Sequence, residues 1–188
     1  MKHLTISEIT FITVISSAMG VLWCLYGFIY SALAPLLQVF AIDNLLSGVW
    51  LIGGVFFGYI IRKPGSALLG EVVASVVQAF ISKWGISSII YGVIQGLGVE
   101  IVFLIFAYKN WSWLSIILAS IMTALFGFIL NYFWFGYFKL SLTFNILEFT
   151  SSIISGVIFA GILTKLIVDQ LAKTGVLNQY RIAQDQIL

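Results

Sequence analysis

Charged side chains are scarce in this chain. Only 9% of its 188 residues are Asp, Glu, Lys or Arg, whereas 61% are hydrophobic. A water-soluble domain needs a charged surface to remain dissolved, so this composition indicates that lipid is the main solvent. The net charge of +2 comes without a basic block, and we therefore expect no nucleic acid partner.

Cysteine and histidine each occur only once, as Cys24 and His3. Cys24 has no partner for an internal disulfide, and its apolar surroundings indicate a packing residue. A buried zinc or copper site needs more ligands of these two types than the chain has. We therefore expect no metal and no cofactor.

Motifs for catalysis and nucleotide binding are also missing. Gly65 and Gly70 have the outer spacing of a phosphate loop, but Glu71 and Val72 follow where Lys and Ser or Thr are required. The single histidine is terminal, so no nucleophile and base suited to catalysis occur together. The sequence predicts a protein that is not an enzyme, and any ATP hydrolysis must come from partner chains.

What the chain has in abundance is long apolar runs. Each is long enough to cross about 30 Å of hydrocarbon at about 1.5 Å per residue. We predict an all-α integral membrane protein, with one domain over residues 1–188. Its six transmembrane helices are expected near residues 9–30, 45–61, 66–81, 87–108, 112–138 and 142–167.

Two features near the N-terminus need interpretation. The first run resembles a signal peptide, but it is too long and Glu8 interrupts its positive end, so we expect a retained helix. Residues 31–43 contain Pro35 and Gln38 and are predicted to form a linker over the membrane face.

The distribution of cations gives the orientation. With six spans both termini lie on one side, and only Lys83 and Lys139 then fall on the other side. The positive-inside rule places both termini in the cytoplasm, with the chain in the plasma membrane.

Three carboxylates lie within the predicted spans: Glu71, Glu100 and Glu148. An acid at mid-membrane costs about 3 kcal/mol on insertion scales unless it is paired or used. Counted from the span ends, Glu71 and Glu100 lie at similar depths in the inner half. They could form an intramembrane acid pair that holds a proton.

Polar residues form a stripe on each of four spans, with aromatic rings toward the outer end. Residues three, four or seven apart share a helix face. If the stripes converge, they enclose a pocket for a small heteroaromatic molecule; alternatively, each amide bonds a neighbouring helix. The predicted pocket residues are Gln78, Trp84, Tyr91, Gln95, Asn131, Trp134, Asn145 and Glu148.

Small residues mark one face of the first span. Ser16 and Gly20 have the small-xxx-small spacing that allows close helix approach, and Thr13 and Ser17 lie nearby. This face either packs within the bundle or slides against the helices of a partner protein.

Several stretches resemble a known family. The most specific are the Arg62-Lys63-Pro64-Gly65 turn and the run from Gln95 to Gly98 with Glu100; the matching regions are 49–53, 62–68, 70–71, 91–98 and 174–178. They resemble the YkoE family of substrate-binding S components of energy-coupling factor (ECF) transporters. That family is associated with thiamine and its precursor hydroxymethylpyrimidine.

The resemblance implies a six-helix subunit that captures a vitamin outside the cell. It implies docking on a transmembrane coupling (T) protein carried by two ATP-binding subunits, followed by toppling in the membrane to release the ligand. Such subunits usually meet the coupling protein through small residues of the first span, here Thr13, Ser16, Ser17 and Gly20.

The ligand implied by the resemblance depends on charge. Gln78 and Asn131 stand where the family often has acids, which favours neutral hydroxymethylpyrimidine over cationic thiamine. Pyridoxine and other small heterocycles fit the same description. The alternative functions are a proton-coupled carrier that works as a dimer, with Glu71 and Glu100 as its proton site, and a lipid-modifying membrane enzyme.

Overall fold

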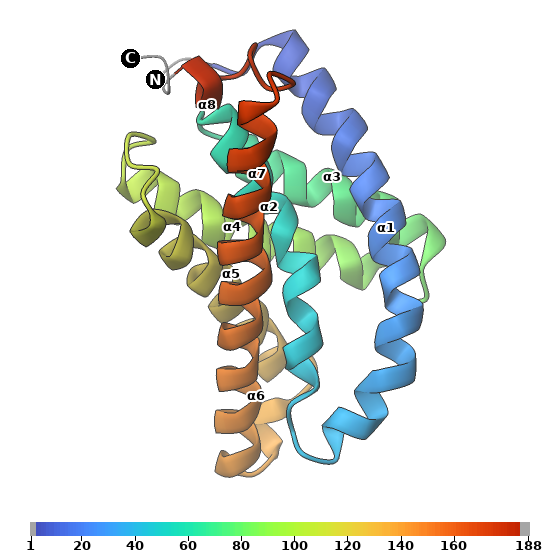
Figure 1. Ribbon diagram of the computed structural model, residues 1–188. Coiled ribbons are helices and arrows are strands. Elements are labelled where there is room, and N and C mark those ends of the chain that lie inside the picture. Colours follow the sequence, from blue (N-terminus) through green and yellow to red (C-terminus); the bar gives the residue numbers. More distant parts are fainter. Residues whose placement is uncertain (1–2, 185–188) are drawn as a thin grey trace.

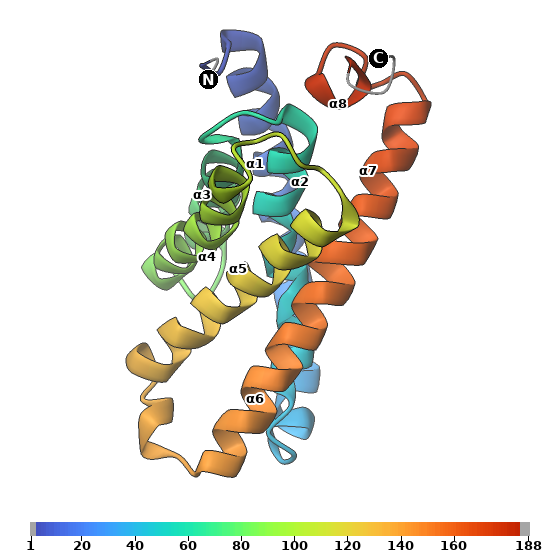
Figure 2. The ribbon, with the colours of Figure 1, turned by 90° about the vertical axis from the view of Figure 1, so that its left-hand side faces the viewer.

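The computed structural model describes residues 3–184 and is helical, with no strand in this range. Figures 1 and 2 show the arrangement of the helices. The elements are α1 (Ile6–Gln38), η1 (Asp43–Leu51), α2 (Ile52–Ile61), α3 (Ser66–Ile81), α4 (Ile86–Ile105), α5 (Trp113–Trp134), η2 (Tyr137–Lys139), α6 (Leu142–Ser155), η3 (Gly156–Leu163), α7 (Thr164–Lys173) and α8 (Arg181–Gln184). The predicted all-α membrane class is confirmed.

Five stretches are long and apolar enough to cross a membrane: α1, η1 with α2, α4, α5, and α6 through α7. The third predicted span forms α3, which has only 16 residues. Figure 1 shows α3 and α4 running across the direction of α1 and α7. The start of α1 and α8 lie at the same end of the molecule in both views (Figures 1 and 2); that this end is cytoplasmic stays a prediction.

The first helix is longer than predicted. It begins at a capping box between Thr5 and Glu8, and it continues through Pro35 to Gln38, so the predicted linker at 31–43 is wrong. Proline removes one backbone donor, and near a helix end this loss is tolerated when the flanking residues continue to pack. The chain then turns at Ala41, whose φ is 56°, and enters η1.

The last span is also longer than predicted. Helices α6 and α7 are joined by η3, a π-helical segment over Gly156–Leu163, into one apolar run from Leu142 to Lys173. The fourth and fifth spans are shorter than predicted because residues 106–112 and 135–141 form turns and the short η2.

Close packing of α1 on α3 depends on a glycine. A Cβ on Gly20 would overlap the carbonyl oxygen of Ala74, and Ser16, one turn earlier, is fully buried. Thr13 is exposed and Ser17 is half-buried. Ser16 and Gly20 therefore pack inside the bundle, and the predicted contact of this face with a coupling protein stays a prediction.

Gly20→Val is expected to destabilise the protein by about 1–3 kcal/mol, because the new side chain must push α1 away from α3. Reversible unfolding in mixed micelles measures the change. Ala18→Val makes the same kind of enlargement at an exposed position of α1 and should leave the stability within about 0.5 kcal/mol of wild type. Equal effects of the two variants would contradict the close packing at Gly20.

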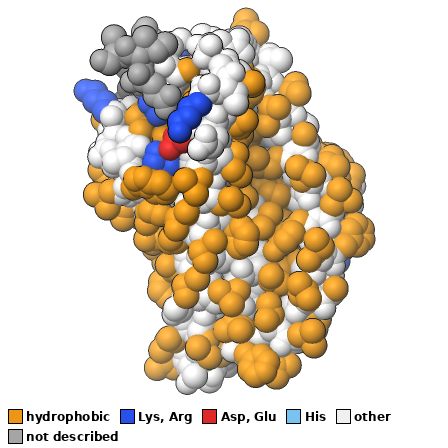
Figure 3. Space-filling view, in the orientation of Figure 1, with side chains coloured by type: hydrophobic (Ala, Val, Ile, Leu, Met, Phe, Trp, Pro, Cys, Tyr) orange, Lys and Arg blue, Asp and Glu red, His pale blue; other side chains and the backbone are white. Residues whose placement is uncertain are grey.

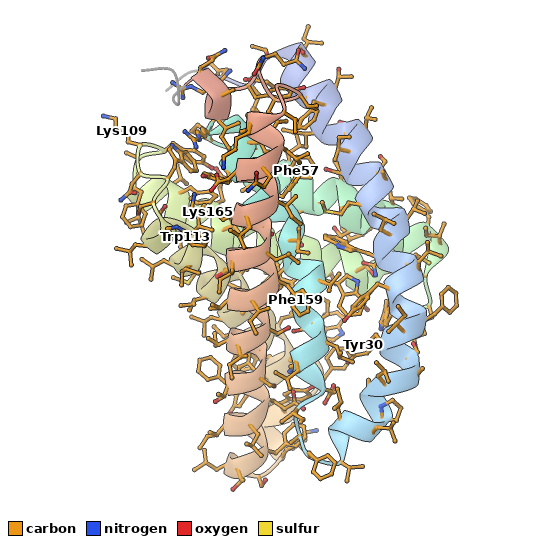
Figure 4. All side chains as sticks on the ribbon, in the orientation of Figure 1. Tyr30, Phe57, Lys109, Trp113, Phe159 and Lys165 are labelled. Carbon is orange, nitrogen blue, oxygen red and sulfur yellow. The ribbon has the colours of Figure 1, made fainter. Side chains whose placement is uncertain are left out.

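Charged residues gather at the end that carries α8, and the rest of the face in Figure 3 is largely hydrophobic. Lys63 Nζ lies 2.7 Å from Glu8 Oε2, and both side chains are almost completely buried. Lys165 lies 3.0 Å from Asp169 and sits over the Trp113 ring (Figure 4). The first pair ties α1 to the α2–α3 turn. The second lies within α7, and the Tyr59 hydroxyl of α2 donates to Asp169 at 2.6 Å, which ties α7 to α2.

Candidate ligand-binding pocket

A cavity of about 1000 Å³ lies between α1, η1, α3, α4, α5, η2 and α6. Its wall combines aromatic rings with amides, hydroxyls and carboxylates, which is the mixture typical of small-molecule sites. Helix α3 contributes Glu71, Ser75 and Gln78, and α4 contributes Tyr91 and Gln95.

Five of the eight predicted pocket residues line this cavity: Gln78, Trp84, Tyr91, Gln95 and Asn131. Gln78 and Gln95 are both buried. The Tyr91 hydroxyl donates to Asn131 Oδ1 and so joins α4 to α5. The helical spacing of these residues therefore placed them correctly on faces that meet, and their contact with a ligand stays a prediction.

The other three predicted residues lie elsewhere. Trp134 is 55% exposed, at the last residue of α5. Asn145 Nδ2 donates to the carbonyl oxygens of Tyr137 and Ser141, at 2.9 and 3.0 Å, so it holds the α5–α6 connection in place. Glu148 is fully buried behind the wall, where it faces Asp43 and Asn44 of η1.

The two inner carboxylates have separate partners. Glu100 accepts from the backbone N–H groups of Gly65 at 2.6 Å and Leu68 at 3.3 Å, and from the Tyr108 hydroxyl at 2.5 Å. It therefore caps the N-terminus of α3, where unpaired N–H groups favour an anion. No hydrogen bond among the described residues joins it to Glu71, in contrast to the predicted proton-sharing pair.

Glu71 belongs to the pocket. It is only 1% exposed, and its Oε2 accepts from the Gly54 N–H at 2.5 Å. Its Oε1 is buried without a hydrogen-bond partner among residues 3–184. Because an unsatisfied buried acceptor costs free energy, this oxygen is suited to accept from a donor that enters the cavity.

Sequence reasoning missed the wall formed by α1 and η1. Trp23, Tyr30, Asp43, Asn44 and Trp50 all line the cavity. The only signal was the polar Asp-Asn pair at the start of the second span, and residues 31–43 had been assigned to a surface linker. Figure 4 shows Tyr30 on the side of α1 that faces η1.

An aromatic cluster lies on this wall. The ring centroids of Tyr30 and Trp50 are 5.1 Å apart, and those of Trp50 and Trp84 are 5.6 Å apart. The Trp84 ring also packs on Gly27, where any Cβ would collide with it. The cluster joins α1, η1 and the α3–α4 loop, and offers faces and edges for a planar ligand.

Two further groups complete the outer part of the wall. Lys83 Nζ donates to Ser31 Oγ at 2.7 Å and so ties the α3–α4 loop to α1. Burial, with the nearby Glu148 and Asp43 carboxylates, raises the pKa of Tyr137 above its ordinary value. The Tyr137 phenol therefore stays neutral at physiological pH and can donate a hydrogen bond.

Comparison with known proteins gives three matches. The family model for the permease component of an ABC-type cobalt transport system matches residues 7–126. The chain is 35% identical over 179 residues to YkoE of Bacillus subtilis (strain 168), which is named as an HMP/thiamine permease protein; the match covers 95% of this chain and 89% of that one. A crystal structure of an S-component of an ECF transporter superimposes with a TM-score of 0.92 and 32% sequence identity, over 98% of this chain and 93% of the other.

The matches to YkoE and to the S-component structure indicate the same family, and both agree with the observed fold. They extend over nearly the entire sequence, including the helices that enclose the cavity and the long apolar stretches of a multi-pass membrane protein. The chain belongs to the YkoE family of substrate-binding S components of energy-coupling factor transporters.

Proposed function

We propose that this chain is the substrate-capture subunit of an ATP-driven vitamin importer, and that its pocket binds the aminopyrimidine ring shared by hydroxymethylpyrimidine and thiamine. The observation that carries the proposal is Glu71 in the wall of the cavity, with a carboxyl oxygen, Oε1, that has no hydrogen-bond partner among the described residues. An exocyclic amino group is a donor that fits this acceptor. Gln78 and Gln95 lie on the same wall and can pair with ring nitrogens.

The structure changes the charge argument about the ligand. The expected preference for the neutral pyrimidine rested on the missing acids at Gln78 and Asn131. Asp43 lines the cavity from η1, and Glu148 interacts with it from α6, so acidic groups are present at the cavity. We therefore propose that both molecules bind, and that thiamine places its cationic ring toward Asp43 and the aromatic cluster.

Energy must come from other chains. We propose that a transmembrane coupling protein and two ATP-binding subunits supply it. The outward face of α1 is the proposed contact with the coupling protein. It carries the exposed Thr13, Val14, Val21 and Leu25, and Ser17 lies beside them.

Uptake measurements test this function. The purified chain alone should bind radiolabelled hydroxymethylpyrimidine and thiamine, whereas uptake into vesicles should require the coupling protein and the ATP-binding subunits. Mass spectrometry of the molecule that copurifies with the chain identifies the natural ligand. Uptake by the chain alone, driven by a pH gradient, would instead select the proton-coupled carrier.

A further inference from the structure

The environment of Glu148 is unusual for a carboxyl group. It comes from α6 and is 0% exposed. The Asp43 carboxyl group faces it from η1, and the backbone N–H and the side chain of Asn44 interact with it as well. Asp43 is 5% exposed, and its Oδ1 has no hydrogen-bond partner among the described residues.

Two neighbouring carboxylates cannot both be ionised in a medium of low dielectric constant without a cation. A single proton shared between them removes one charge and supplies the donor for a hydrogen bond between the two carboxyl groups. Asp43 reaches the pocket, because it lines the cavity while Glu148 lies behind it. A charge that enters the pocket therefore acts directly on the pair.

The other titratable groups near the pair are phenols. Tyr30 of α1 donates to Asp43 Oδ2 at 3.1 Å, and Tyr137 of η2 interacts with both carboxyl groups. Tyr132 of α5 packs against Phe128 and other rings instead. Phenols donate hydrogen bonds and bring no positive charge at neutral pH.

Two cations line the same cavity, and each has another partner. Lys83 Nζ donates to Ser31 Oγ and lies 5.1 Å from the centre of the Trp84 ring. Lys139 Nζ lies 5.5 Å from the centre of the Phe138 ring. Both lysines are exposed, where water screens their charge.

We propose that Asp43 and Glu148 share one proton in the ligand-free protein, and that a cationic ligand displaces this proton whereas a neutral ligand leaves it in place. The inference rests on the proposed function in assigning the cavity to ligand capture. The inference distinguishes two ligands that share the aminopyrimidine ring. Thiamine carries a positive charge that can replace the charge of the proton, whereas hydroxymethylpyrimidine is neutral and cannot replace it.

The direction of the pH effect follows from linkage. If binding releases a proton, a higher pH favours the bound state, so thiamine affinity should rise with pH as long as the pair retains its proton. Release of one whole proton corresponds to about a tenfold gain in affinity per pH unit. Hydroxymethylpyrimidine affinity should not change over the same range.

The first experiment needs no ligand. Infrared spectroscopy of the detergent-solubilised full chain should show, at neutral pH, a carbonyl stretch of a protonated carboxylic acid that is lost in both Glu148→Gln and Asp43→Asn. Glu71→Gln, which changes a buried carboxyl group outside the pair, should retain that component. If Glu148→Gln and Asp43→Asn leave the spectrum unchanged, the shared proton does not exist.

The second experiment measures proton release. Titration calorimetry with thiamine, in buffers of different ionisation enthalpy, should show release of up to about one proton per bound ligand in the wild type and none in Glu148→Gln. Hydroxymethylpyrimidine should release none in either protein. Thiamine binding without proton release in the wild type would overturn the displacement step. Failure of both ligands to bind would refute the proposed function, while the infrared result would still decide whether the pair holds a proton.

Discussion

Glu71→Gln is expected to weaken binding of both hydroxymethylpyrimidine and thiamine by about tenfold to a hundredfold. A buried polar group that is left without its partner costs about 1–3 kcal/mol, and about 1.4 kcal/mol corresponds to a factor of ten in affinity. The glutamine oxygen can still accept from Gly54, so the fold should survive. Its amide nitrogen, however, would present a donor to the amino group of the ligand.

Equilibrium binding of each ligand to the purified variant measures the effect. Glu100→Gln is the matched control, because it makes the same change in a buried carboxyl group that caps α3 and does not line the cavity. The control should bind both ligands like the wild type, provided thermal unfolding shows that it is folded. Equal affinities of Glu71→Gln and wild type would remove Glu71 from the site.

Lys63→Met is expected to reduce the free energy of unfolding by about 3 kcal/mol, because it leaves Glu8 as a buried charge without its cation. The Lys63 side chain is 8% exposed and that of Glu8 is 10% exposed. Their bond joins the start of α1 to the turn between α2 and α3. Reversible unfolding in mixed micelles measures the loss.

A double variant separates the charge from other effects of the substitution. Lys63→Met combined with Glu8→Gln removes both charges and keeps an acceptor for the Thr5 cap, so it should recover much of the lost stability. Lys109→Met is the control for the loss of a surface cation, since Lys109 is exposed and projects from the α4–α5 turn (Figure 4). If Lys109→Met destabilises the protein as much as Lys63→Met, the pair has no special role.

The fold class could be predicted from the sequence because hydrophobic length and the scarcity of charge are properties of single segments. The run from Ser66 to Ile81 was predicted with the bounds that α3 has, since the Arg62-Lys63-Pro64-Gly65 turn marks its start. Where no such signal existed, the bounds were wrong. Helix α1 passes through Pro35 because its neighbours pack against η1 and the α3–α4 loop, and these contacts are not visible in the local sequence.

For the pocket, the helical spacing of polar residues correctly predicted which residues share a face of one helix. It did not predict which faces of different helices meet. It placed Gln78 on one face of α3 with Glu71, and Tyr91 with Gln95 on α4, and all four line the cavity. Counting residues from the span ends placed Glu71 and Glu100 at the same depth as a pair, but the Glu100 carboxylate, which extends from α4, binds the backbone N–H groups of Gly65 and Leu68 and caps α3.

By itself, the sequence determined that the chain is a helical membrane protein and that its few buried polar groups need partners. Both conclusions follow from the free energies of transferring individual residues from water to lipid. Only the tertiary structure decided which polar groups meet. Asp43 and Glu148 are more than a hundred residues apart, and they face each other only because η1 folds back against α6. Helix crossing, which depends on the packing of several segments at once, sets that arrangement.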